Sequence, residues 1–240
     1  MNTGFHKDLD TNFELACEMS EYEFQHEELL ELLKSGNIPQ KQIAALKLDK
    51  IQNSEEAKIL MDNLIGCDGK IREAVALKIN QLLIADKNLL PLFTQYEKAP
   101  FADATIDING NICRLVIDSV SILKTDEEFA NKYLEKLFIF IDETFTELDG
   151  FIFRDKKYVI NKQLFKLYWC LESLKLFVQV IPTQKLLPVL QRAAQEKEYT
   201  IREKVAQILV LLDDDIYEPL KNKLKKDENY YVREAFLALH

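Results

Sequence analysis

The segment of this sequence most suggestive of chemistry is Gly66-Cys67-Asp68-Gly69-Lys70, because glycines followed by a lysine can form a phosphate-binding loop. The nucleotide-binding form of that loop needs about four residues between its glycines and a serine or threonine after the lysine. Here two residues separate Gly66 from Gly69, and Ile71 follows Lys70. We therefore interpret the segment as a turn that begins a helix.

Histidines and cysteines could hold a metal or act as nucleophiles, but their spacing fits neither role. His6 and His240 lie near the ends, and His26 lacks the second histidine of a zinc-protease helix. The cysteines form no Cys-x-x-Cys pair and stand about 50 residues apart. We expect them to be reduced and mostly buried: Cys17, Cys67, Cys113 and Cys170.

The run Asp213-Asp214-Asp215 could bind a cation, but it lacks the alternating acids, central glycine and distal glutamate of a calcium loop. A solvated turn between helices is the better interpretation. We therefore predict no catalytic residue, no cofactor and no metal. This sequence favours a binding protein over an enzyme.

The composition predicts helices. The chain has 240 residues, of which 48% are hydrophobic, enough for a continuous core. It contains only 6 glycines and 6 prolines, and its regular stretches are rich in good helix formers. We predict an all-α protein.

Internal repetition supports this fold class. The segment 40–48 aligns with 71–79, with Ala-Leu-Lys in register, and 201–206 aligns with 232–237; both shifts are 31 residues. Three of the six arginines stand at one repeat position, in Ile71-Arg72-Glu73, Ile201-Arg202-Glu203 and Val232-Arg233-Glu234. A polar turn that can cap a helix precedes each triplet.

These triplets and turns resemble the HEAT repeat, including the HEAT-like repeats of phycobiliprotein lyase proteins. The resemblance implies an α-α superhelix of about five or six antiparallel helix pairs, forming one domain over 1–240. It also implies a ladder in which the repeat arginine pairs with a turn acid, here Arg72, Arg202, Arg233 and Asp68. The likeness spans about 27–240 and weakens in the middle, where Cys113 stands in place of the arginine and 158–181 has no signature.

Helical periodicity places the other elements independently of the family. Apolar residues recur every three or four positions on two expected second helices: Ile71, Ala74, Val75, Ile79, Leu82 and Leu83 on one, and Leu164, Leu167, Tyr168, Leu171, Leu174 and Val178 on the other. We expect partner helices at about 12–34, 55–65, 88–96, 126–146, 183–195 and 216–225. Helices should therefore alternate in pairs along the chain.

The negative charge is concentrated near the N-terminus, where residues 1–34 carry nine acids against two lysines. This region is either a solvated helix face or a surface that repels nucleic acid and attracts a basic partner. The sequence pI of about 5.0 and the use of arginines at the repeat position argue against DNA or RNA binding. With no apolar leader segment and no apolar run long enough to cross a bilayer, the expected location is cytoplasmic.

Two connections too long for plain turns suggest a binding edge. Segments 97–111 and 147–157 both join the first helix of a pair to the second, so we expect them side by side. Segments 151–153 and 158–160 could form a small β-hairpin. Aromatic side chains on this edge could anchor a partner or could simply cap helix ends: Phe101, Phe145, Phe151, Phe153 and Tyr158.

A second candidate surface is the face of the second helices, with polar positions Lys78, Gln81, Asp118, Ser121, Lys175, Glu203 and Gln207. The architecture favours a scaffold or adaptor that binds a protein or peptide through this face or the aromatic loop edge. The alternative, which rests on the resemblance, is an accessory or catalytic protein of the bilin-lyase-like type. DNA or RNA binding is the least favoured.

Overall fold

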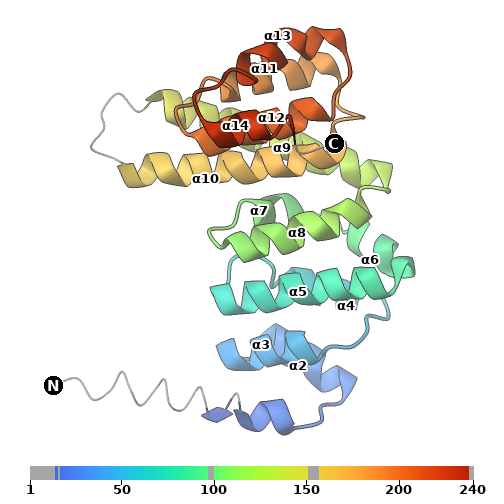
Figure 1. Ribbon diagram of the computed structural model, residues 1–240. Coiled ribbons are helices and arrows are strands. Elements are labelled where there is room, and N and C mark those ends of the chain that lie inside the picture. Colours follow the sequence, from blue (N-terminus) through green and yellow to red (C-terminus); the bar gives the residue numbers. More distant parts are fainter. Residues whose placement is uncertain (1–13, 16, 97–99, 151–156, 238–240) are drawn as a thin grey trace, which may run out of the picture. The chain divides into compact units, whose positions relative to one another are not determined.

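The computed structural model describes residues 14–15, 17–96, 100–150 and 157–237, and in these ranges every regular element is a helix (Figure 1). The predicted all-α fold class is confirmed. The chain divides into two compact units, Met1–Asn131 and Lys132–His240. The division falls within α9 (Glu127–Gly150).

The first unit is built of two layers of helices. In one layer α4 packs on α2 and α6 packs on α4; in the other α5 packs on α3 and α8 packs on α5. Each helix of the first layer also packs on one of the second, which gives the pairs that the sequence predicted. The first layer consists of α2 (His26–Ser35), α4 (Ser54–Met61) and α6 (Leu90–Thr94), and the second of α3 (Ile38–Lys47), α5 (Gly69–Ala85) and α8 (Gly110–Leu123).

The second unit repeats this arrangement around α12 (Tyr199–Val210). Helix α12 packs between α10 and α14 along the row of second helices, and α11 and α13 pack against it. The 3-10 turn η3 (Lys175–Phe177) extends α10, and η4 (Asp215–Tyr217) leads into α13. This unit also holds the part of α9 from Lys132 onward. Its other helices are α10 (Lys157–Leu174), α11 (Thr183–Ala193), α13 (Glu218–Leu224) and α14 (Tyr230–Glu234).

Four of the second helices begin with one shared device. A side-chain oxygen of the N-cap residue accepts a hydrogen bond from the backbone N–H two residues later, which satisfies one of the free donors of the first turn. Asp68, Asn109, Glu198 and Asn229 do this for α5, α8, α12 and α14. The segment 66–70 is thus a helix-start turn, as predicted, and Gly66 supplies a positive φ of 74° there.

The structure differs from the sequence prediction in four places. The single helix expected over 12–34 is interrupted at 22–25, because Gln25 and Glu28 form a capping box that starts α2 anew. The helices expected at 88–96 and 216–225 each begin as a 3-10 turn, η1 (Lys87–Leu89) and η4. The expected loop 97–111 contains a further helix, α7 (Phe101–Thr105), which packs on α8.

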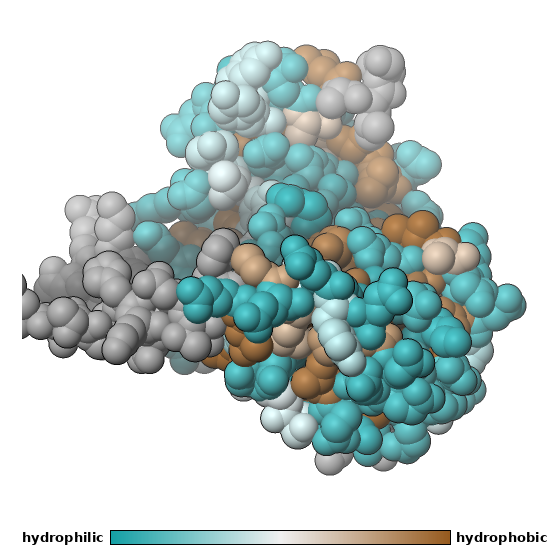
Figure 2. All heavy atoms as spheres, turned by 90° about the horizontal axis from the view of Figure 1, so that it is seen from below, coloured by the Kyte–Doolittle hydropathy of each residue, from teal (hydrophilic) through white to brown (hydrophobic). Residues whose placement is uncertain are grey.

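The acids of the N-terminal region that the structure describes lie on a solvated surface. Glu27, Glu28 and Glu31 are all exposed on α2. In Figure 2, viewed from the end of the first unit that holds α2, the front surface is largely hydrophilic and its hydrophobic residues form small separate groups. Within the described ranges, no helix is long and apolar enough to cross a membrane.

Candidate functional site

The arginine at the repeat position of α5 joins two successive repeats of the first unit. Arg72 donates through Nε to Oδ2 of Asp107 at 2.6 Å and through Nη2 to Oδ1 at 3.1 Å. Its Nη1 also donates to the carbonyl of Cys67. The hydrogen bonds that Arg72 donates to Asp107 raise the pKa of Arg72, against the opposing effect of burial. Arg72 therefore acts as a structural clamp between the turns of two repeats.

The second unit repeats this clamp. Arg202 donates through Nε and Nη2 to the two carboxylate oxygens of Asp227, at 2.8 and 3.0 Å, and through Nη1 to the carbonyls of Glu196 and Lys197. The side chains of Arg202 and Asp227 are only 10% and 9% exposed. Arg233 donates to the carbonyls of Asp227 and Glu228.

The acid of the clamp is not the one that precedes the arginine. Asp68, expected in the ladder, is exposed and caps its own helix, whereas Arg72 reaches Asp107 in the turn of the next repeat. The structure also shows what replaces the arginine in the middle of the ladder, where Cys113 stands. Cys113 is fully buried, and its thiol donates to the carbonyl six residues before it, as Arg202 and Arg233 do. A cysteine thus occupies the arginine position and satisfies the equivalent carbonyl.

The clamp makes the stability of the second unit dependent on pH. Hydrogen bonds from Arg202 hold the pKa of Asp227 below its usual value, even though burial acts in the opposite direction. A lowered folded-state pKa means that the stabilisation is fully present above the unfolded-state pKa of about 3.9 and is lost as the pH falls through the folded-state value.

We therefore expect the stability advantage of the wild type over Asp227→Asn to be constant between about pH 7 and pH 5 and to shrink below about pH 4. Urea unfolding of both proteins across this range, followed by circular dichroism, measures the difference. An advantage that persists unchanged at pH 3 would contradict the assignment.

A second polar network lies on the face of the second helices. Lys204 contacts Glu172 at 2.5 Å, and Lys175 contacts the same carboxylate at 3.0 Å. Gln207 accepts from Lys204 at 3.1 Å and from Lys175 at 3.3 Å. Burial alone would raise the pKa of Glu172, but hydrogen bonds from Lys204 and Lys175 outweigh it and lower this pKa.

Three of the predicted face residues take part in this network. Lys175 and Gln207, both predicted to bind a partner, lie together with their polar atoms engaged, and Glu203 accepts from Gln207 at 3.1 Å. In the first unit, helices α5 and α8 pack on each other and carry the other predicted face residues. Gln81 and Asp118 are exposed there, whereas Lys78 and Ser121 are half-buried. Burial lowers the pKa of Lys78.

The predicted aromatic loop edge takes a different form. Phe101 is 1% exposed and packs edge-on against Phe129 at 5.7 Å, so it is a core residue of α7. Phe145 lies half-buried on α9, with the Arg192 guanidinium 5.1 Å from its ring centre. Phe151 and Phe153 lie outside the described residues. Tyr158 belongs to α10, and because 158–160 are helical the predicted hairpin is wrong there.

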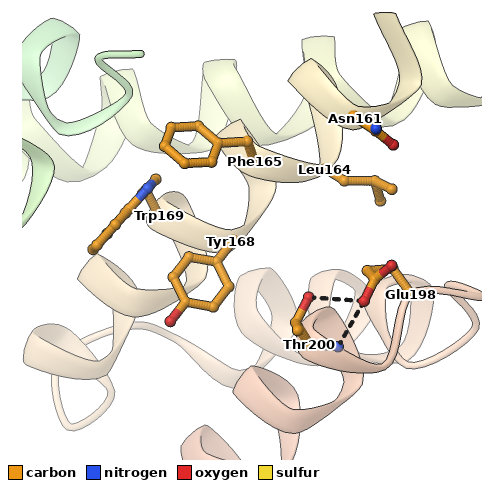
Figure 3. A pocket seen from close by; sticks show the side chains of 7 residues that line it. All are labelled: Asn161, Leu164, Phe165, Tyr168, Trp169, Glu198 and Thr200. Atoms are coloured by element: carbon orange, nitrogen blue, oxygen red, sulfur yellow. Dashed lines mark hydrogen bonds between the residues drawn. The ribbon is translucent and has the colours of Figure 1, made fainter. Parts of the chain in front are cut away.

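The structure instead shows a pocket of about 530 Å³ on α10, which the sequence did not predict. The residues of α10 that line it recur every three or four positions and therefore lie on one face of the helix. Residues at the start of α12 line the other side of the pocket. In Figure 3 the rings of Phe165, Tyr168 and Trp169 project from α10, and Glu198 bonds to Thr200 across from them. The α10 pocket is lined by Asn161, Leu164, Phe165, Tyr168, Trp169, Glu198 and Thr200.

Beside the pocket lie three exposed tyrosines, which we call the tyrosine cluster. Tyr199 follows the pocket residue Glu198, and its ring stacks on that of Tyr231 with centroids 6.0 Å apart. Tyr230 meets Tyr231 edge-on at 5.6 Å. The three are 36%, 58% and 57% exposed for Tyr199, Tyr231 and Tyr230 respectively. The cluster therefore presents aromatic surface to solvent at the starts of α12 and α14.

Among the described residues, no group of three or more histidines, cysteines and acids lies close enough to hold a metal ion. The described residues that line the α10 pocket include no cysteine or histidine and one carboxylate, Glu198, which also caps α12. What the pocket and the tyrosine cluster offer is aromatic surface, a few polar groups and one carboxylate. These are the components of a recognition site.

Comparisons with known proteins add little to this description. No family model matches the chain, and no curated protein matches it. Among solved structures, the crystal structure of an engineered protein is similar to this chain, with 13% sequence identity and a TM-score of 0.46. The match covers 90% of this chain and 94% of that chain. A likeness of this degree carries no conclusion about family or function.

Proposed function

We propose that this chain is a HEAT-like repeat scaffold that holds another protein, and that the partner contacts the second unit at the α10 pocket and the tyrosine cluster. The observation that supports this most is the exposure, beside a pocket, of three tyrosines of which two contact the ring of the third, Tyr231. Tyrosine is enriched among the residues that contribute most to protein interfaces, because its ring buries a large area at a small entropic cost.

The rest of the second-helix face is less suited to this role. Its charged groups Glu172, Lys175 and Lys204 already bond one another. Breaking these bonds for a partner would cost about as much as the new contacts return. The tyrosine rings are exposed, and covering them removes apolar surface from water. The partner is therefore expected to spare the network and cover the rings.

The test is affinity capture from an extract of the native cells, using the wild-type protein beside a Tyr199→Ala/Tyr231→Ala double variant. We expect at least one protein retained by the wild type to be lost, because truncating interface tyrosines typically costs about 1–3 kcal/mol each. Quantitative mass spectrometry of the retained proteins measures the loss, and circular dichroism confirms that the variant is folded.

The matched control is Tyr22→Ala, which removes a 54% exposed tyrosine from the first unit. It should retain the same proteins as the wild type. If the double variant and the wild type retain identical proteins, the tyrosine cluster is not the binding surface.

A further inference from the structure

We propose that the α10 pocket receives an arginine side chain from a basic segment of the partner, with the tyrosine cluster covering the residues beside it. This inference rests on the proposed function and specifies the chemistry of the bound segment. It follows from three features of the pocket: its carboxylate, its aromatic rings and the excess of acids around it.

The carboxylate is Glu198. It accepts two long hydrogen bonds, from the backbone N–H of Thr200 at 3.5 Å and from its hydroxyl at 3.3 Å. Arg202 lies near enough to interact electrostatically with it, but its Nε and Nη2 donate to Asp227 and its Nη1 donates to two backbone carbonyls. Glu198 therefore keeps lone pairs that a guanidinium could engage through short, charge-assisted bonds.

The apolar side chains and the amide of the pocket can contact the aliphatic stem and the guanidinium of an arginine. Leu164 and Phe165 offer apolar surface for its aliphatic stem, and Asn161 offers an exposed amide oxygen. A cation already lies near one ring of this site, because Nζ of Lys204 is 4.7 Å from the ring centre of Tyr168. A planar guanidinium stacks on aromatic faces and forks onto a carboxylate, which an ammonium cannot do.

The surrounding charge favours a basic partner over an acidic one. In the turns and first turns of α12 and α14, six acids stand against five bases, and Glu228 is 91% exposed. The bases there are Lys197, Arg202, Lys225, Lys226 and Arg233, and two of these five are engaged in the clamps. The acids are Glu196, Glu198, Glu203, Asp227, Glu228 and Glu234. Charge of this sign attracts an arginine-bearing segment and repels an acidic one.

The experiment titrates the full chain into a short fluorescent glycine–serine peptide that carries several arginines, followed by fluorescence anisotropy. Matching peptides carry glutamine or lysine in place of arginine. We expect the arginine peptide to bind, the lysine peptide to bind several-fold more weakly, and the glutamine peptide not to bind. Glu198→Gln should weaken binding of the arginine peptide about fivefold to tenfold, which is the effect of losing one charge-assisted bond at a partly exposed site.

Two further variants test whether the peptide binds in the α10 pocket. Asn161→Ala changes the opposite wall of the pocket without touching the cap of α12, and should weaken binding about threefold. Asp213→Asn removes the same charge as Glu198→Gln, from an exposed position beyond the other end of α12, and should leave affinity within about twofold of wild type. Thermal unfolding followed by circular dichroism checks that each variant folds.

The inference is overturned if arginine and glutamine peptides bind alike, if neither binds, or if Glu198→Gln and Asp213→Asn have equal effects. None of these results decides whether the chain binds a protein through the tyrosine cluster, which the capture experiment tests separately. If the tyrosine double variant loses a captured protein while the arginine peptide fails to bind, the scaffold role stands and the arginine pocket falls.

Discussion

Replacing Arg202 by alanine is expected to lower the free energy of unfolding of the second unit by about 3 kcal/mol. The guanidinium makes a two-pronged contact with Asp227 and also bonds the carbonyls of Glu196 and Lys197. Without the guanidinium, the nearly buried carboxylate of Asp227 and two backbone carbonyls lose hydrogen-bond donors. Each buried acceptor left without a donor lowers the free energy of unfolding. Urea unfolding followed by circular dichroism at neutral pH measures the change.

The control is Arg114→Ala. Arg114 lies exposed on α8, one position beyond the repeat arginine site, and its truncation should change stability by less than about 0.5 kcal/mol. Equal effects of the two substitutions would mean that the clamp between repeats contributes no more than an ordinary surface arginine.

Replacing Asp107 by alanine is expected to destabilise the first unit by a similar amount, about 3 kcal/mol. Asp107 accepts both bonds of Arg72 and also the backbone N–H of Asn109 at 2.8 Å. Without it, a half-buried guanidinium keeps only its bond to the carbonyl of Cys67. Unfolding of the purified full chain, monitored by hydrogen exchange of α5 and α8, separates this loss from effects on the second unit.

Asp68→Ala is the matched comparison, because the two aspartates stand in successive repeat turns. Asp68 only caps α5, so its removal should cost about 1 kcal/mol. If Asp68→Ala proved the more damaging of the two, the clamp would run within a repeat and not between repeats.

Much of the fold could be predicted because helical order leaves a periodic record in sequence. The 31-residue shift placed the starts of α5, α12 and α14, and their N-cap residues followed from the polar turns. The break before α2 was missed because apolar periodicity continues through 22–25, and only the reciprocal bonds of Gln25 and Glu28 show that a new helix begins.

The partner of the ladder arginine was harder to predict. Sequence places Asp68 four residues from Arg72 and Asp107 thirty-five residues away. Only the packing of α8 against α5 brings the distant acid within reach. The family resemblance implied a ladder between repeats with a turn acid, but it did not identify Asp107 as that acid.

The proposed binding surface was the least predictable part. Aromatic content pointed to loops 97–111 and 147–157, but the short helix α7 buries Phe101. Leu164 and Tyr168 followed an apolar stripe and were expected in the core, whereas they line a pocket. One signal was available: Tyr199 and Tyr230 are equivalent under the 31-residue shift, at the first position of each helix, where side chains are seldom buried.

The most direct test of the central claim places a photo-crosslinking phenylalanine analogue at position 231 and, separately, at position 139, where Ile139 is 50% exposed on α9 of the same unit. The proteins are illuminated in extract of the native cells, and covalent adducts are identified by mass spectrometry. The account predicts a discrete protein adduct at position 231 that is missing or much weaker at position 139. Equal adducts at the two positions, or an adduct only at position 139, would contradict it.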